Sequence, residues 1–266
     1  EKVKFSLNKL RASLKHTGAD KETIDQIICK VRDELYQGIS TKEIYNRAFA
    51  LLKKKKSYLA SKYKLKKAIY ELGPTGFPFE KFIAAIFKYS GYNTAVGNIL
   101  QGKCVTHEID VIAHKNGDTT IVECKFHSEE GRNCNVKIPL YIAARFKDVK
   151  EYWDSKPHTT NLNEGWVVTN TRFTVDALQF GKCIGLKLLS WDYPKNNGIK
   201  KSIDKYGLYP ITTLTTLTKK EKTHLIEKDI ILVKELSQNP EVLNQLSISE
   251  KQKESILAEV RILCNS

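Results

Sequence analysis

Two short segments near the middle of the chain alternate apolar residues with charged ones. Residues 108–113 read Glu-Ile-Asp-Val-Ile-Ala, and residues 121–126 read Ile-Val-Glu-Cys-Lys-Phe. This pattern is typical of half-buried β-strands. Between them lies the turn of residues 115–118, whose Asn-Gly pair is a strong hairpin signal. The pattern therefore predicts an antiparallel hairpin.

The segments around the hairpin predict an α/β fold. Apolar residues at helical spacing between Pro78 and Gly91 predict a helix before the hairpin. After it, the pattern predicts a helix that begins near Pro139, then a strand, a helix and a strand over residues 165–170, 175–181 and 185–191. This succession predicts a mixed sheet flanked by helices.

Both ends of the chain are predicted to be helical. Asp20 and Ser40 stand at N-cap positions, and Gly38 follows the second helix. The predicted helices cover residues 7–14, 21–35, 41–52 and 59–72 at the N-terminal end, and 219–227, 231–237, 240–246 and 250–263 at the C-terminal end. We therefore expect three domains: residues 1–72, 73–210 and 211–266.

The hairpin also carries candidate chemistry. Side chains two apart on a strand share a face, so Glu123 and Lys125 project together and the Cys124 side chain points away. Antiparallel pairing would bring Asp110 close to Glu123. Carboxylates are preferred ligands of Mg²⁺, and a nearby ammonium can orient a water or offset charge on a phosphate. The pattern indicates a metal-dependent nuclease site, with an ordinary half-buried surface hairpin as the alternative.

These residues, with Glu80 on the preceding helix, resemble the PD-(D/E)XK nuclease superfamily and, within it, the Mrr-like restriction endonucleases. The resemblance covers about residues 74–192. It implies that Asp110 and Glu123 bind Mg²⁺ or Mn²⁺, that Lys125 is the catalytic lysine, and that Glu80 is an auxiliary acidic residue. We expect the main-chain carbonyl of Cys124 to add a ligand and Lys125 to position the attacking water.

Five further residues near the hairpin have alternative interpretations. Lys137 and Arg145 are candidates for binding DNA phosphates or belong to a solvated helix face. His127 shares a face with Lys125, where it would touch substrate or end the strand in solvent. His107 points away from the carboxylate face, which favours a structural hydrogen bond over metal binding. Glu108 shares the carboxylate face and is a candidate outer-shell residue.

The net charge of +14 favours a polyanionic partner such as DNA. The charge is uneven, with 18 basic and 8 acidic residues in 1–72, 18 and 14 in 73–212, and 8 of each in 213–266. The lysines at 53–56 and at 62, 64, 66 and 67 would follow a nucleic-acid backbone, bind nucleotide phosphates or form a solvated helix face. The excess charge therefore lies mainly outside the predicted nuclease core.

The N-terminal helices resemble the ATP-cone, a regulatory domain of ribonucleotide reductases and of a repressor of their transcription. Residues 5–10, 38–45 and 59–65 carry the resemblance. It implies binding of ATP or dATP, with Lys9 and Thr41 approaching the nucleotide. Family members open with a nucleotide-contacting strand, and this sequence begins after it. A cone kept as a docking or DNA-contacting module is the alternative.

The C-terminal helices resemble helix-hairpin-helix modules, which bind DNA backbones through glycine-containing hairpins. Here residues 246–249 contain serines instead of glycines, and the segment has no net charge. This composition favours protein–protein contacts or intramolecular packing over direct DNA binding.

No apolar run approaches the roughly 18 residues of a membrane helix, and no signal-like segment opens the sequence. We therefore expect a cytoplasmic protein with no membrane partner and with its six cysteines reduced. The combined hypothesis is a homodimeric, Mg²⁺- or Mn²⁺-dependent endonuclease acting on DNA and regulated by ATP or dATP. The alternatives are a catalytically inactive DNA-binding protein and a nucleotide-responsive regulator.

Overall fold

The computed structural model describes residues 6–157 and 159–265. Contacts divide the chain into two compact units. The sheet unit comprises residues 69–210, and the helical unit comprises residues 1–68 together with residues 211–266. The sequence suggested separate N-terminal and C-terminal helical domains, whereas these contacts group the two segments in one unit.

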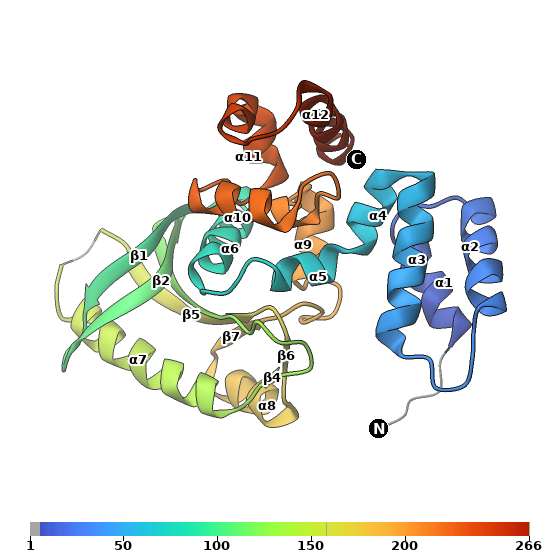
Figure 1. The fold of residues 1–266 in the computed structure, drawn as a ribbon. Helices are drawn as coiled ribbons and strands as arrows, with labels where there is room; N and C mark the ends of the chain where they lie inside the picture. The colour runs from blue at the N-terminus through green and yellow to red at the C-terminus, as the bar shows by residue number, and fades with distance from the viewer. Residues whose placement is uncertain (1–5, 158, 266) are drawn as a thin grey trace. The chain divides into compact units, whose positions relative to one another are not determined.

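The sheet unit is built on a five-stranded sheet in the order β1-β2-β3-β5-β7 (Figure 1). The antiparallel strands are β1 (Asn93–Gln101), β2 (Thr106–Lys115) and β3 (Asp118–Lys125). The strands β5 (Asn161–Thr169) and β7 (Lys187–Leu189) continue the sheet in parallel from β3. The predicted mixed sheet is confirmed, although the sequence pattern did not predict strand β1.

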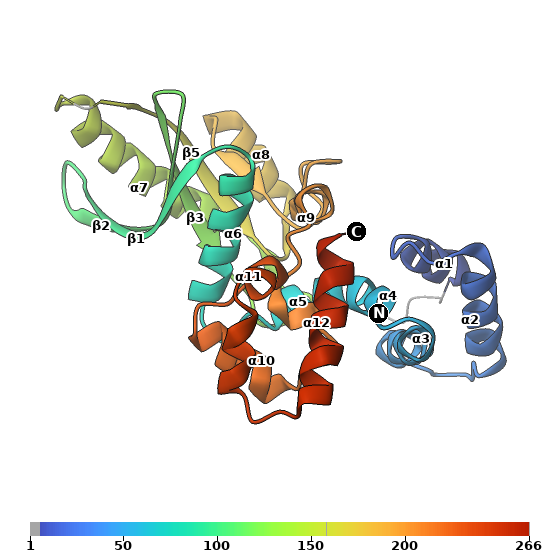
Figure 2. The same ribbon diagram turned by 90° about the horizontal axis from the view of Figure 1, so that it is seen from above.

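Helices cover both faces of this sheet. Helix α6 (Phe77–Tyr89) lies on one face, and α7 (Lys137–Asp154) lies on the other (Figure 1, Figure 2). Further elements of the unit are α8 (Val175–Ile184), α9 (Ile199–Tyr206), and the short parallel pair β4 (Asn133–Cys134) and β6 (Arg172–Phe173). Helix α5 (Leu65–Tyr70) spans the boundary between the units.

The hairpin of β2 and β3 forms as its turn residues predict. Asn116 and Gly117 both have positive φ, at 53° and 82°, and Lys115 pairs with Asp118 across the turn. A two-residue turn with two positive φ angles matches the twist of its strands. Register then continues to Val111 opposite Val122, one residue before the candidate site.

Two buried layers fix the sheet between its helices. On α6, Phe79, Phe82 and Ile83 are fully buried. On the other face, Ile121 packs in a cluster with residues of α7. Close packing there requires Gly165, because a Cβ at this position would lie 2.9 Å from the Phe146 ring. The sheet therefore holds the hairpin and α7 in a fixed relation.

The helical unit opens with α1 (Leu7–Lys15), α2 (Lys21–Asp33), α3 (Thr41–Lys55) and α4 (Ser57–Tyr63). The expected caps form, because the side chains of Asp20 and Ser40 accept the N–H groups of Thr23 and Glu43. The predicted helix 59–72 is divided into α4 and α5. The remaining elements are η1 (Ile211–Thr213), α10 (Lys219–Glu227), α11 (Val233–Gln238), η2 (Pro240–Gln245) and α12 (Glu250–Cys264).

A buried carboxylate, Glu259 of α12, joins segments of this unit that lie far apart in sequence. Only 3% of Glu259 is exposed, and its oxygens accept hydrogen bonds from Ser57 and Ser61 of α4. They also accept the N–H groups of Thr215 and Thr216, at 3.0 Å each. Although burial raises its pKa, these hydrogen bonds outweigh that effect and lower the pKa below the ordinary value.

Two lysines of the N-terminal basic run also have structural partners. Lys53 Nζ donates to the carbonyl of Thr215 at 3.0 Å, and Lys64 Nζ donates to the carbonyl of Thr212 at 3.2 Å. Part of the basic run thus helps to join the two segments of the helical unit.

Candidate functional site

The carboxylates of Asp110 and Glu123 lie where the paired part of the β2–β3 hairpin ends. Asp110 Oδ2 accepts the main-chain N–H of Cys124 at 2.6 Å. Glu123 is only 6% exposed, and the charge of Asp110 acts with burial to raise its pKa. The predicted convergence of these two carboxylates is therefore present in the structure.

Arg145 reaches Glu123 from α7, the helix that covers this face of the sheet. Its Nη1 donates to Glu123 Oε2 at 2.7 Å and to the carbonyl of Glu108 at 3.0 Å. Its Nη2 donates to the hydroxyl of Tyr141, one turn earlier on the helix, at 2.6 Å. From the sequence Arg145 is a candidate for phosphate binding, but here it is the counterion of Glu123. The ion pair is largely buried, with side chains 17% and 8% exposed.

Three acidic groups in this region are harder to ionise than usual. Burial, followed by the charges of Asp110 and Glu108, raises the pKa of Glu80 to about 7. Burial, followed by the charge of Asp110, raises the pKa of Glu123 to about 7, despite the opposing effect of Arg145. Burial likewise raises the pKa of Asp110. Glu80 of α6 therefore lies close enough to Asp110 and Glu108 for their charges to act on it, and its auxiliary role stays a prediction.

One oxygen of Glu123 is left without a partner. Oε1 is buried and accepts no hydrogen bond from the described residues, whereas Oε2 is held by Arg145. A buried unpaired carboxylate oxygen beside another carboxylate is unfavourable unless a proton or a cation is bound there. The donor set fits a divalent cation with oxygen ligands.

Lys125 ends β3 on the same face as Glu123, with its side chain exposed. Its charge acts on Asp110, where it favours the ionised carboxylate. Nearby, His127 donates its main-chain N–H to Asn170 Oδ1 at 2.9 Å, and its carbonyl accepts from Asn170 Nδ2 at 2.8 Å. Burial lowers the pKa of His127, and its Nε2 is buried without a hydrogen-bond partner among the described residues.

Two other residues near the hairpin, His107 and Lys137, differ in their surroundings. His107 Nε2 and Asp148 Oδ2 lie 2.8 Å apart, which confirms the structural hydrogen bond expected for His107. Asp148 also accepts the N–H of Cys104 at 2.9 Å, and with these bonds its pKa falls to about 2. Lys137 begins α7 and is exposed, so its predicted contact with DNA stays a prediction.

Comparisons with known proteins agree with this geometry. Residues 74–192 match a family model described as restriction endonuclease, and residues 209–264 match one described as AF1548-like, C-terminal. An uncharacterized protein of Archaeoglobus fulgidus is 32% identical over 180 residues, which cover 67% of this chain and 98% of the relative. The chain belongs to the family of this archaeal protein. The crystal structure of AF1548, a protein of unknown function, superimposes with a TM-score of 0.59 at 29% identity, covering 72% of this chain and all of AF1548.

The relationship to this archaeal protein and the two family-model matches bear on each part of the sequence interpretation. Residues 74–192 form a restriction endonuclease-like domain, which confirms the predicted fold and indicates a nuclease. The C-terminal segment carries the AF1548-like match, and its likeness to helix-hairpin-helix modules stays a prediction. Both matches lie within residues 74–264, so the ATP-cone resemblance of the N-terminal helices stays a prediction as well.

The residues predicted to bind nucleotide lie in the helical unit, on separate helices. Lys9 is in the first turn of α1, and Thr41 is the first residue of α3; both are exposed. Phe5, which opens the stretch that carries the cone resemblance, lies outside the described residues. In the described part of the chain, no helix has the length and apolar character needed to cross a membrane.

The sequence interpretation missed three hydrogen-bonded pairs near the site: Arg145 with Glu123, Asn170 with His127, and Asp148 with His107. The two residues of each pair lie 22 to 43 positions apart in the sequence. The only local signal was the four-residue spacing of Tyr141 and Arg145, which places both on one side of a helix.

Proposed function

We propose that this protein is a Mg²⁺- or Mn²⁺-dependent endonuclease that hydrolyses DNA phosphodiester bonds. The observation that carries the proposal is the unpaired, buried Oε1 of Glu123 beside Asp110, with Lys125 on the same face. Its place in a restriction endonuclease-like domain supports the same activity.

The proposed metal ligands are the carboxylates of Asp110 and Glu123 and the main-chain carbonyl of Cys124. Among the described residues, no group of three or more His, Cys, Asp or Glu side chains is arranged to hold a metal. Mg²⁺ suits such a site, because it commonly binds through one or two carboxylates and keeps several waters. A structural zinc site, by contrast, requires four protein ligands.

When bound, the metal ion would stabilise charge on the scissile phosphate and lower the pKa of a coordinated water. Lys125 Nζ would orient the attacking water and offset negative charge on the phosphate. Glu80, with a pKa of about 7, is suited to hold or release a proton near neutral pH. Arg145 would fix Glu123 through Oε2 and leave Oε1 for the metal.

Two further features extend the proposal. Cleavage of both strands of a duplex needs two sites or two events, which favours a homodimer. ATP or dATP bound through Lys9 and Thr41 would regulate the activity, as the ATP-cone resemblance implies. DNA contacts from Lys137 and His127 would help to position the substrate.

A plasmid-nicking assay tests the activity. Wild-type protein with Mg²⁺ or Mn²⁺ should nick supercoiled DNA, and Glu123→Gln and Lys125→Met should each lower the rate about 100-fold or more. Lys147→Met, at an exposed position of α7, serves as the matched control and should behave as wild type.

Equal nicking by the two site variants would refute the catalytic assignment. A wild-type protein that binds DNA in a salt-sensitive manner but does not cleave it would favour the inactive DNA-binding alternative.

A further inference from the structure

A cavity lies in the sheet unit on the side of the sheet that carries α6, opposite the face toward which the Glu123 side chain points. Its volume is about 530 Å³, within the range of small-ligand sites, roughly 300–1,000 Å³. Trp166 of β5 lines it and pairs in register with Val122, whereas the neighbouring Glu123 points toward α7. Because successive residues of a strand face opposite sides, the cavity and the Glu123 side chain lie on opposite faces of the sheet.

One side of the cavity is aromatic. The Phe87 and Trp166 rings meet edge to face, with centroids 5.4 Å apart at 86°, and Phe87 and Tyr92 meet at 5.4 Å and 70°. Trp166 Nε1 donates to Glu164 Oε2 at 2.9 Å, which fixes the orientation of the indole. Such an ordered ring offers a flat surface on which a planar ligand can stack.

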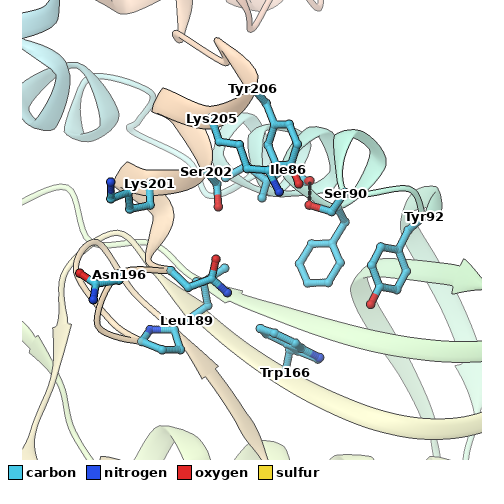
Figure 3. A pocket seen from close by; sticks show the side chains of 13 residues that line it. Ile86, Ser90, Tyr92, Trp166, Leu189, Asn196, Lys201, Ser202, Lys205 and Tyr206 are labelled. Carbon is cyan, nitrogen blue, oxygen red and sulfur yellow. Dashed lines mark hydrogen bonds between the residues drawn. The ribbon is translucent and has the colours of Figure 1, made fainter.

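The opposite side is polar and positively charged. Lys201 and Lys205 are one turn apart on α9, and Figure 3 shows Lys205 and Tyr206 across the cavity from Trp166. Lys201 and Asn196 lie toward the end of the cavity away from Tyr92. Among the described residues that line the cavity, none is acidic.

The first two amides of α9 are already hydrogen-bonded within the protein. The N–H of Ile199 is donated to the carbonyl of Ser190 at 2.9 Å, and that of Lys200 to the carbonyl of Trp191 at 3.2 Å. An anion in this cavity would therefore depend on the side-chain ammonium groups of Lys201 and Lys205. Both side chains are exposed and can adjust to a phosphate.

We propose that this cavity binds a phosphorylated nucleoside, as a free nucleotide or as part of a single strand. Its base stacks on Trp166, and the amides of Asn196 and its neighbour Asn197 contact polar atoms of the base. Its phosphate lies near Lys201 and Lys205. The proposal does not depend on cleavage, because none of these residues belongs to the carboxylate site.

Calorimetric titration of the full chain tests the site, with dAMP, dTMP, ATP and a short 5′-phosphorylated oligothymidylate as probes. Quenching of Trp166 fluorescence gives a second signal, which Trp166→Phe should remove. The double variant Lys201→Ala/Lys205→Ala should weaken binding at least about 10-fold, because two charge-assisted contacts to the phosphate are lost. The control Lys200→Ala, on the same helix but outside the cavity lining, should bind as wild type.

The probes also separate the two sources of the ligand. An oligonucleotide that binds at least about 10-fold more tightly than the mononucleotides would identify a strand, and equal binding would identify a free nucleotide. Adenosine and inorganic phosphate should each bind more weakly than dAMP, because each offers only half of the contacts.

Three results would overturn the proposal: no binding of any probe, binding unchanged in the double lysine variant, or binding lost only in Lys9→Ala, which would place the nucleotide on the N-terminal helices. Glu123→Gln should bind nucleotide as wild type even if no variant cleaves DNA, so this proposal and the nuclease proposal can fail separately.

Discussion

Replacing Glu123 with Gln should make the stability of the metal-free protein less sensitive to pH. The carboxyl group has an ordinary pKa of 4.5 and a pKa of about 7 in the folded protein, where its side chain is 8% exposed. The folded state therefore binds a proton that the unfolded chain releases, and its stabilising effect is lost as pH rises from 4.5 to 7. Linkage between these two pKa values gives a loss of about 2.5 kcal/mol from about pH 5 to about pH 8.

The free energy of unfolding can be measured for the sheet unit alone. All three tryptophans of the chain, at positions 153, 166 and 191, belong to this unit, so their fluorescence during urea unfolding reports on it. In EDTA, the wild type should lose more stability between pH 5 and pH 8 than Glu123→Gln does. Part of the slope should remain in the variant, because Glu80 also has a pKa of about 7. Glu130→Gln, at an exposed loop position, should follow the wild type.

Two results would refute this reasoning: a wild-type stability that does not fall above pH 5, or an equal fall in Glu123→Gln. Added Mg²⁺ should restore stability at pH 8 in the wild type and have little effect in the variant, because a bound cation replaces the lost proton. Restoration in both proteins would place the metal elsewhere.

Three other substitutions test separate features of the fold. Arg145→Met should destabilise the sheet unit by roughly 3 kcal/mol at pH 8 and by less at pH 5, because ionised Glu123 loses its buried partner; an equal loss at both pH values in urea unfolding would contradict this. Glu259→Gln should lower the free energy of unfolding of the helical unit by about 2 kcal/mol, as followed by circular dichroism, because a charged acceptor of several hydrogen bonds is lost. Glu254→Gln, at an exposed position of the same helix, should leave that free energy unchanged. Gly117→Ala should destabilise the sheet unit by about 1 kcal/mol because of its φ of 82°, and unchanged tryptophan-detected stability would argue against the left-handed turn.

The parts of the fold that the sequence predicted are those with local causes. Asn116 and Gly117 form a tight turn by their own conformational preferences, and the alternation on either side sets the faces of β2 and β3. Strand β1 escaped prediction for a physical reason: its residues alternate between exposed and partly buried, and none is fully buried. An edge strand of this kind carries little apolar signal.

The part of the site that the sequence predicted also has a local cause. Glu123 and Lys125 share a face by the period of a strand, so their proximity could be predicted from the sequence alone. The ion pair with Arg145 depends on how α7 crosses the sheet, which no local pattern specifies. The raised pKa values of Glu80 and Glu123 likewise arise from burial by the assembled sheet and helices.

The sheet unit begins directly after Ala68 and ends just before Thr212. Thr212 Oγ1 donates a hydrogen bond to the carbonyl of Ala68 at 2.6 Å, so the two ends of the sheet unit lie close together. The sheet unit is thus an insertion within the helical unit, and inserted domains are tolerated where their ends lie close together. During synthesis, the ribosome releases Ser57 and Ser61 about 200 residues before their partner Glu259. The sheet unit can therefore fold before the last helix of the helical unit has been synthesised. A variant in which a short peptide links Ala68 directly to Ile211 should fold as the helical unit alone.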